Sequence, residues 1–419
     1  MLNRLVRRLR RLRPRPLDAR AEAVEPLLLS SPTLDLEPGA GRALHRHRHL
    51  LGSLDGLEAW LEQDRPGQGP AWEHPSDAAV RLLYWGLAAP RLGRQLPQVA
   101  GSARAHLAFT LDHLGPVERP QTALQAAGLV VGGLAFPVEG GREAFSQGLG
   151  LLGRCLGAQV LGDGSPAHGS SALLQRSLSA ALLARRFARA ARAPFPVEAE
   201  AALGRGAWFL RVLGEGGPLA LGEDPYEALL DETPAEIWDA VLSLGLAPGE
   251  GAGGEAARCA LLGGSALSPS SLAGKEWSLW SFLEGGVAVL HSRHGRVVFS
   301  ERHGLVWTRS GQAVLHVGPL PGRLSSARVD GRRATAVVEG AQGRRELRAE
   351  GGRVQLIERG VGGSVFLLPG LELQAGKKTG WVAFGPGTRL QVDVEEGRLR
   401  TGGVEAFGSG RRRASFELR

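Results

Sequence analysis

Two histidines stand in surroundings where an imidazole could move a proton. His168 follows Asp163 in a loop rich in glycine and serine, and His303 follows Glu301 and Arg302. Because imidazole titrates near neutral pH, both rings are candidate general acids or bases. For His168 the alternative is a solvated histidine in a surface loop, without a catalytic role.

A second set of residues could hold a charged sugar. Trp307 lies among strand residues and could stack on a sugar ring. Arg302, Arg309 and Arg323 lie near it in the sequence and could pair with carboxylates or sulfates through two parallel hydrogen bonds. We assign Asp163 to the same substrate-binding set. A solvated strand surface would explain the arginines equally well.

The sequence predicts neither a metal site nor a cofactor. His45 and His49 would share one face of a helix, but no carboxylate lies near them and arginines alternate with the histidines. Phosphate-binding and dinucleotide-binding motifs are absent, and no Gly-x-Ser-x-Gly segment stands between a strand and a helix. Cys155 and Cys259 fit no zinc spacing and make no disulfide framework.

The chain carries a formal net charge of +8 over 419 residues, and arginine supplies nearly all of the positive charge. The only lysines are Lys275, Lys377 and Lys378. An arginine-rich surface suits anionic partners, and a solvated charged surface is the alternative. Because the basic residues are scattered and no nucleic-acid-binding motif is present, we expect no nucleic-acid partner.

The stretch Met1–Arg15 is basic and offers a weak contact with a membrane surface. A short helix leading into the first domain is the alternative. No apolar segment typical of a signal peptide follows, and no apolar run is long enough to span a membrane. We therefore expect a cytoplasmic or membrane-peripheral protein, with the periplasm as the alternative. The oligomeric state stays open.

The elements that must position these residues fall into two blocks, and the first is helical. In the stretch Ser76 to Ala88, Ser76 is a candidate N-cap, and Val80, Leu83 and Tyr84 fall on one face. Similar apolar spacing predicts helices over residues 103–114, 122–134, 144–156, 171–190, 198–213 and 235–244. Recurring helix–turn–helix units of this kind suit a helical toroid.

The second block has the period of β-strands. Alternation predicts strands over residues 286–291, 296–300, 313–317, 334–339 and 391–394, and Asp330-Gly331 is a hairpin signal. Short strands with frequent turn signals indicate an antiparallel β-sandwich. The predicted fold is therefore an N-terminal α/α toroid (residues 1–247), a Gly- and Ser-rich linker (248–275) and a C-terminal antiparallel β-sandwich (276–419).

Several motifs, in this order along the chain, resemble one family, the heparinase II/III-like proteins. They are the N-terminal Val6–Pro14, Trp72-Glu-His-Pro-Ser with Arg81-Leu-Leu-Tyr-Trp85, Ala123–Leu129 with Phe136-Pro137, Gln159–Ser165 with Ser170 and Ser171, Arg211 with Gly216–Asp224, and Gly285–Leu290 with Ala406-Phe-Gly408. The resemblance spans nearly the whole chain, and it is the order of the motifs that carries it.

The resemblance implies cleavage of uronate-containing polysaccharides by β-elimination. Such a reaction needs a group that neutralises the C6 carboxylate, a base for the C5 proton and an acid for the leaving oxygen. The family supplies these groups with Asn-His on a toroid helix, a tyrosine after the Asp-Gly segment and histidines of the β domain. Tyr226 lies in a loop where the family's substrate cleft opens, which makes its phenol a further catalytic candidate.

The sequence departs from the family pattern at the catalytic positions. Gly115 and Pro116 fall where Asn-His is expected, and Leu173 falls where the tyrosine is expected. The usual His-x-His-x-Asp segment is not recognisable, and its neighbourhood corresponds to His303–Trp307. The primary expectation is thus a β-elimination lyase acting on an acidic polysaccharide, if the protein is active. The alternative is an inactive relative that binds or helps handle an acidic exopolysaccharide.

Overall fold

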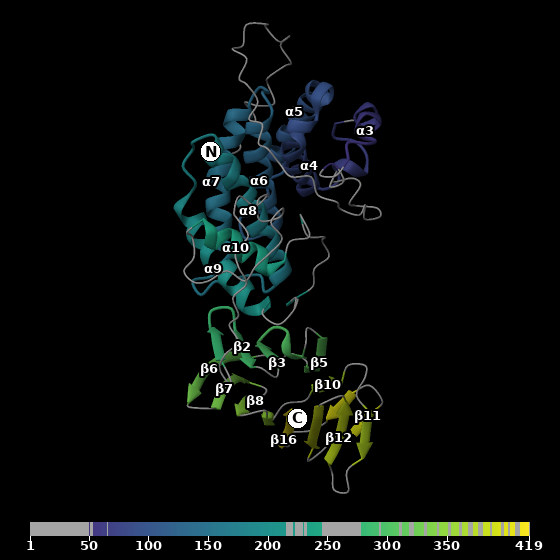
Figure 1. Cartoon of the computed structure of the whole chain (residues 1–419), viewed down its shortest axis with the longest axis vertical. Helices are drawn as coiled ribbons and strands as arrows, with labels where there is room; N and C mark the ends of the chain where they lie inside the picture. The colour runs from purple at the N-terminus through teal and green to yellow at the C-terminus, as the bar shows by residue number, and fades with distance from the viewer. Residues whose placement is uncertain are drawn as a thin grey trace.

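The computed structural model places helices up to Ser243 and strands in the last third of the chain (Figure 1). The predicted linker 248–275 and the basic stretch 1–15 lie outside the described residues, so both remain predictions. The structure describes residues 50, 53–64, 66–214, 221–222, 229, 233–244, 278–292, 295–309, 312–317, 322–330, 333–341, 343–350, 353–359, 363–367, 372–375, 380–385, 388–394, 398–400, 403–406 and 411–418.

The predicted helices are confirmed, most within a few residues at each end. The α-helices of the described part are α3 (Leu57–Gln63), α4 (Pro75–Ala88), α5 (Leu96–Asp112), α6 (Pro120–Ala135), α7 (Gly141–Gln159), α8 (Ser171–Ala190), α9 (Val197–Gly214) and α10 (Pro234–Ser243). Three short 3₁₀ turns, Pro70–Trp72, Ala89–Arg91 and Gly93–Gln95, lie between α3 and α5.

One predicted cap is wrong. The helix α4 begins at Pro75 and its N-cap is His74, so Ser76 lies inside the first turn and does not cap it. Proline is favoured at this first position because it lacks the N–H that would go unpaired there, and because its φ is already helical. The proline therefore moves the start of the helix upstream of the serine.

Helix α6 lies at the centre of the helical part and packs against α4, α7 and α8. Its buried residues surround it on nearly all sides, which is typical of a helix enclosed by others. A Cβ at Gly128 would lie 2.6 Å from the carbonyl oxygen of Ala79, so α6 approaches α4 more closely than any side chain would allow. The small residues of α6 thus set the spacing of the helical core.

A buried polar cluster fastens α4 to α5. The guanidinium of Arg81 donates from Nε to Nε2 of His106 over 2.8 Å, and both side chains are fully buried. Nδ1 of His106 lies 2.9 Å from the carbonyl oxygen of Ser102 and donates to it, because Nε2 already accepts. The rings of Trp72 and Trp85 pack on the imidazole with centroids 4.3 and 4.7 Å away. Burial, with the charge of Arg81, holds the pKa of His106 well below its usual value.

The strands form two antiparallel sheets. The strands are β1 (Ser278–Phe282), β2 (Val287–Ser292), β3 (Gly295–Ser300), β4 (Gly304–Arg309), β5 (Gln312–Val317), β6 (Arg323–Asp330), β7 (Arg333–Gly340), β8 (Gly343–Glu350), β9 (Arg353–Arg359), β10 (Gly363–Leu367), β11 (Glu372–Ala375), β12 (Gly380–Gly385), β13 (Thr388–Val394), β14 (Arg398–Arg400), β15 (Gly403–Ala406) and β16 (Arg411–Leu418). All five predicted strands are present.

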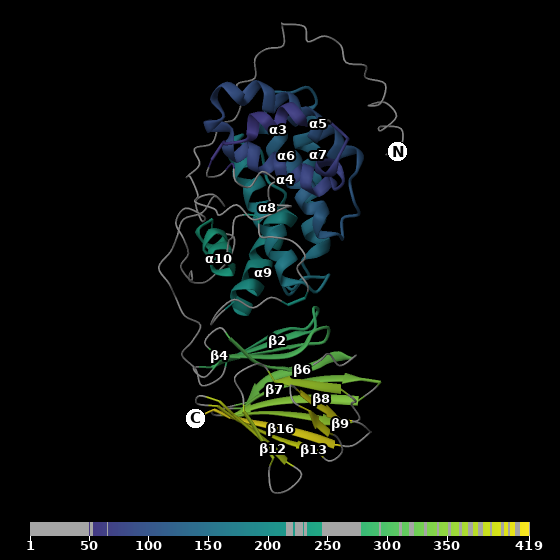
Figure 2. The ribbon, with the colours of Figure 1, turned by 90° about the vertical axis from the view of Figure 1, so that its right-hand side faces the viewer.

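The first sheet has the order β1-β2-β3-β4-β5-β10-β15-β14, and the second has the order β11-β12-β13-β16-β9-β8-β7-β6. A hairpin joins β6 and β7 as predicted, but Asp330 pairs with Arg333 and still belongs to β6, so the two-residue connection begins one residue later than predicted. In Figure 2, β2 and β4 lie between the helices and the strands of the second sheet. The first sheet is therefore the one that meets the helical part.

Among the described helices, none is long and apolar enough to cross a membrane. Within the same part of the chain, no group of three or more His, Cys, Asp or Glu side chains could hold a metal ion.

The buried His106 predicts a stability that falls as the solution is acidified. Since the pKa of His106 in the folded protein lies well below 6.5, the unfolded chain takes up the proton first as the pH falls. The free energy of unfolding should then fall below pH 6.5 by at most about 1.4 kcal/mol per pH unit for this one group. Urea unfolding at pH 7.5, 6 and 5 measures this loss.

The variant His106→Gln should be less stable at pH 7.5 and should lose less stability on acidification than the wild type. His74→Gln is the matched control, because this histidine is exposed and makes no capping hydrogen bond. Equal acid sensitivity of wild type and His106→Gln would contradict the role given to the Arg81–His106 pair.

Candidate functional site

The junction between the helices and the first sheet gathers four of the eight candidate residues: Asp163, His168, Arg302 and His303. The loop between α7 and α8 meets the β1–β2 turn and the β3–β4 turn there (Figure 1). Phe209 of α9 packs edge-on against Phe282 of β1, with ring centroids 4.8 Å apart. Phe282 and Val289 belong to the same apolar cluster as the helices, so the two parts share a core across the junction.

Asp163 ties this loop to the β1–β2 turn. One carboxylate oxygen accepts from the backbone N–H groups of Glu284 (2.8 Å) and Gly285 (3.4 Å). The other accepts from the backbone N–H of Ser165 (3.0 Å) and from its hydroxyl. In return, the carboxylate of Glu284 accepts from the N–H of Gly162 over 2.7 Å. These contacts give the predicted substrate-binding Asp163 a structural task, and sugar binding by it stays a prediction.

His168 lies in the same loop and is held neutral. Its Nδ1 accepts from the backbone N–H of Ser170 over 3.2 Å, so the proton of the neutral ring resides on Nε2. Nε2 is shielded from solvent and has no hydrogen-bond partner among the described residues. Burial, helped by the positive charge of Arg302, lowers the pKa of His168 to about 4. The lone pair that a general base needs is therefore already engaged.

His303 contacts the residue next to His168. Its Nε2 donates to the carbonyl oxygen of Gly169 over 2.9 Å, and its backbone N–H donates to Ser300 Oγ over 3.3 Å. Gly169 has a φ of +84°, and a Cβ there would lie 2.7 Å from the Arg302 guanidinium. The structure thus brings His168, Arg302 and His303 together around one glycine.

The other predicted site residues are placed only in part. Trp307 and Arg309 lie on β4, where Trp307 is opposite Val297 of β3, and their side chains are outside the described residues. Arg323 begins β6 and is exposed, and the N–H of the following Leu324 donates to the carboxylate of Glu301. Tyr226 lies outside the described residues, so its role remains a prediction.

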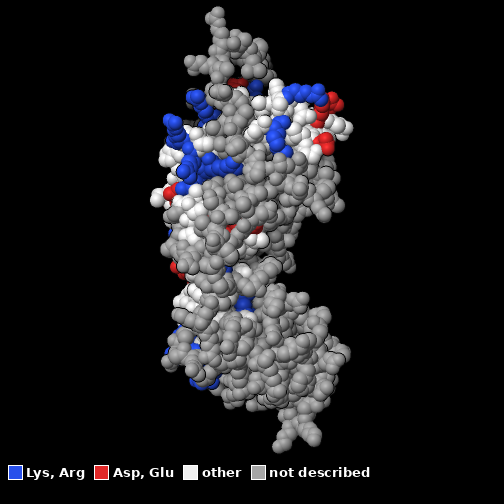
Figure 3. Space-filling view, viewed as in Figure 1, with Lys and Arg blue, Asp and Glu red and all other residues white. Residues whose placement is uncertain are grey.

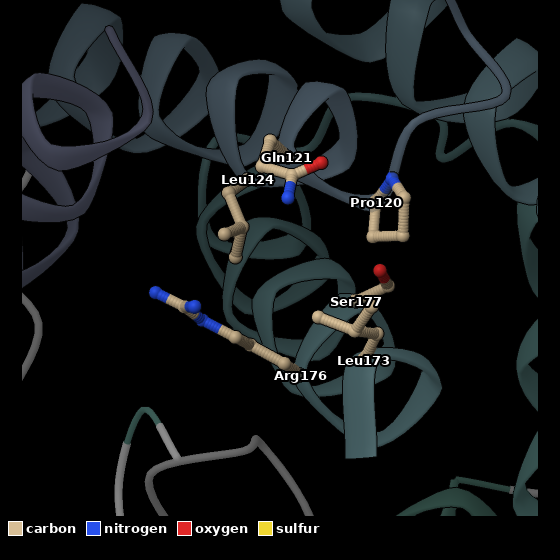
Figure 4. A pocket seen from close by; sticks show the side chains of 6 residues that line it. All are labelled: Pro120, Gln121, Leu124, Leu173, Arg176 and Ser177. Carbon is tan, nitrogen blue, oxygen red and sulfur yellow. The ribbon is translucent and has the colours of Figure 1, made fainter. Parts of the chain in front are cut away.

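A shallow hollow lies beside the helix ends where the family resemblance expects its tyrosine. It is lined by Pro120, Gln121 and Leu124 of α6 and by Leu173, Arg176 and Ser177 of α8 (Figure 4). Its interior leaves no volume for a water molecule. Leu173 therefore presents hydrocarbon in a hollow too shallow to enclose a sugar.

Gln159, at the end of α7, fixes the walls of this hollow. Its side-chain amide donates to the carbonyl oxygens of Val117 (2.7 Å) and Arg119 (2.9 Å), and its carbonyl accepts from the Ser177 hydroxyl (3.2 Å). In the sequence, Gln159 stood out only as part of the motif Gln159–Ser165, with no predicted role. A glutamine among apolar helix residues was the available signal, because a buried amide needs partners for all its polar atoms.

Two buried side chains of the first sheet were also missed. His291 of β2 donates from Nε2 to the carbonyl oxygen of Val212 over 2.8 Å, and Arg296 of β3 donates to that of Leu213. Both carbonyls belong to the last turn of α9, which has no further helical N–H to bind and carries partial negative charge. His291 and Arg296 pair across the two strands, and polar residues inside two apolar strands were the signal.

Comparison with solved structures finds the fold of heparinase III. One heparinase III crystal structure superposes with a TM-score of 0.66 at 13% identity, covering 92% of this chain and 78% of that one. A heparinase III gene product with methylated lysines gives 0.56 at 12% identity, covering 92% and 79%. A mutant of the heparan sulfate lyase HepC from Pedobacter heparinus gives 0.57 at 10% identity, covering 92% and 76%.

These structures establish that the chain has a heparinase-like fold, which confirms the resemblance inferred from the ordered motifs. Their identities, between 10% and 13%, carry the comparison no further than the fold. No family model matches the sequence, and no curated protein matches it.

Removing the Asp163 carboxylate should weaken the junction. Because four donors converge on it, we expect Asp163→Ala to lower the free energy of unfolding by about 2 kcal/mol, within the range for charge-assisted hydrogen bonds. Asp163→Asn keeps one acceptor oxygen and should cost less. Asp112→Ala, an exposed carboxylate at the end of α5, is the control. Urea unfolding of the four proteins decides, and equal midpoints for Asp163→Ala and Asp112→Ala would refute the assignment.

Proposed function

We propose that this protein binds an acidic, uronate-containing polysaccharide on a heparinase-like scaffold without performing the family's usual β-elimination. In this proposal the helices form an α/α toroid and the two sheets form a β-sandwich, with the glycan held near the junction of the two. The observation that carries the proposal is the occupation of the catalytic positions by residues that cannot transfer a proton.

The helix-end hollow supports the loss of proton transfer. Leu173 stands where a tyrosine is expected and has no ionisable group. Gly115 and Pro116 stand where Asn-His is expected, and the N–H of Gly115 donates to the Gln125 amide oxygen over 3.1 Å. Neutralising a uronate carboxylate requires a donor that faces the substrate, so a glycine and a proline leave that part of the reaction without a side chain.

The junction supports the same conclusion. His168 is a neutral ring whose accepting nitrogen is engaged by Ser170, and Nε2 of His303 donates to a backbone carbonyl. Asp163 accepts four hydrogen bonds within the junction. The ionisable groups of the junction thus contribute to holding the two parts together, and proton abstraction would have to compete with these contacts.

The charge of the chain supports an acidic ligand. Arginine supplies nearly all of a formal net charge of +8, and Arg302 and Arg323 are exposed on the turn and strand beside the junction. Guanidinium groups bind carboxylates and sulfates bidentately, which suits a uronate or sulfated polymer. The name of the heparan sulfate lyase that shares the fold gives an acidic polymer as that protein's substrate.

A second candidate is a lyase that uses His168 and His303 in place of the usual set. It is favoured by one observation, the contact of His303 with Gly169, which places the two imidazoles in adjacent positions of the junction. Catalysis by this pair would require the loop to open, because Nε2 of His168 is shielded from solvent here. The two candidates differ in whether unsaturated product forms.

We expect binding without turnover. The full chain should bind immobilised heparan sulfate, and its incubation with heparan sulfate, alginate or an acidic bacterial exopolysaccharide should give no rise in the ultraviolet absorbance of unsaturated uronate. His168→Gln and His303→Gln should leave the binding unchanged. Product formation that both substitutions abolish would establish the second candidate, and absence of binding to all three polymers would refute the proposed function.

A further inference from the structure

The C-terminal part of α8 and the residues just after it carry a dense group of arginines. Arg185 and Arg186 are half-buried, and Arg189 and Arg192 are exposed. Along a helix of 3.6 residues per turn, Arg185 and Arg189 stand on one face, and Arg192 lies two residues beyond Ala190, the last residue of the helix. We call these four residues the α8 basic end.

Arg192 has a backbone conformation that its side chain disfavours. Its φ is +55°, and within the described part of the chain it is the only residue other than glycine with a positive φ. The N–H of Arg192 donates to the carbonyl of Arg189 (3.0 Å), and that of Ala193 donates to the carbonyl of Ala188 (2.9 Å). This is the Schellman termination of a helix, in which the position of Arg192 normally belongs to glycine.

The left-handed backbone at this position favours glycine, so it does not explain why the residue is an arginine. The chain contains 61 glycines, and twelve described glycines have a positive φ, so the usual residue for this conformation is common elsewhere in the protein. An arginine in the left-handed region persists when its side chain contributes something that glycine cannot. A cation near the helix C-terminus favours the dipole, but Arg189 already supplies one in the last turn.

We infer that the α8 basic end is a docking surface for an acidic polysaccharide, separate from the helix–sheet junction. Within this group, Arg185 already forms a salt bridge, in which its Nε lies 3.0 Å from the Glu200 carboxylate of α9. The exposed Arg189 lies one helical turn further along the same face, with its Cβ about 5–6 Å from that of Arg185. The exposed Arg192 follows two residues beyond the end of the helix. Guanidinium groups repeated at this spacing suit the repeated carboxylates or sulfates of a linear polymer.

The position of the surface also favours a polymer over a single sugar. Helix α8 begins at Ser171, directly after the Gly169 that His303 contacts, so its other end lies about 30 Å from the junction for a helix of 20 residues. A chain of several sugar units would reach both places, whereas one unit would not. This inference rests on the proposed function, because it takes the acidic polysaccharide from there.

The test compares affinities for heparin of the full chain and three variants: Arg192→Gly, Arg189→Gln and the two combined. Each single change should weaken heparin binding about two- to fivefold, as expected for one exposed ion pair, and should lower the salt concentration needed for elution from immobilised heparin. The combined change should weaken binding by about the product of the two single effects, roughly four- to twenty-fivefold. Arg328→Gln, which removes the charge of an exposed arginine on β6, is the matched control and should bind like the wild type.

Arg192→Gly separates binding from folding. Glycine accepts the left-handed conformation, so this variant should melt at the same or a higher temperature than the wild type while binding heparin less tightly. Wild-type binding that Arg192→Gly and Arg189→Gln leave unchanged would overturn this inference and leave the proposed function standing. No binding of the wild type to heparin would overturn this inference, and the proposed function would fall with it only if heparan sulfate, alginate and the acidic exopolysaccharide are not bound either. Weakened binding of the variants to RNA or to anionic lipid vesicles, with heparin binding intact, would also overturn it.

Discussion

The contact on which this architecture depends is the one between the Asp163 carboxylate and the β1–β2 turn. A single loop, between α7 and α8, carries the carboxylate, and it is fixed at both ends. Gln159 anchors its start to the α5–α6 connection, and Ser170 ends it by capping α8 through the N–H of Leu173. Because hydrogen bonds hold both ends of the loop to the helices, the position of the helices determines where the loop contacts the sheet. The apolar contact of Phe209 with Phe282 adds buried area to the junction. The hydrogen bonds are directional, so they fix how the helices and the first sheet are positioned relative to each other.

The residue types that make a site reactive are also those that join two domains with defined geometry. A carboxylate accepts several N–H groups at once, and an imidazole can bind two carbonyls or N–H groups from different elements. Asp163, His291 and His303 are used in this way across the junction. From their residue types, His303 was predicted to be catalytic and Asp163 to bind substrate, and the hydrogen bonds give both residues a structural role. A sequence therefore identifies groups that could react, whereas only their partners tell which of them hold the fold.

Local features were predictable because they depend on residues that are close in the chain. The period of apolar residues predicted α8 at Ser171–Ala190, as observed, and alternation predicted β3 and β7 within one residue at each end. At α4 the sequence predicted Ser76 as the N-cap, but the helix begins at Pro75 and its N-cap is His74. One proline can therefore move a helix start away from the position that local residue preferences predict. The strand order, in which β5 pairs with β10 and β10 with β15, depends on residues far apart in the chain. The partners of Gln159, His291 and Arg296 lie on elements distant in sequence, and no local pattern names them.

The low identity to structures with the same fold is understandable from how the helices pack. Gly128 lies against Ala79, Gly148 would place a Cβ 2.8 Å from the carbonyl oxygen of Ala126, and Gly133 would place one 2.4 Å from that of Gly141. Such contacts bring helix backbones close together with little side-chain volume between them, so a chain with only 5% aromatic residues can still fill its core. Many combinations of small and aliphatic residues satisfy this demand, since cores tolerate substitution when volume and pattern are kept. The fold can then persist when the groups at the helix ends differ, because those groups contribute little to the packing that defines it.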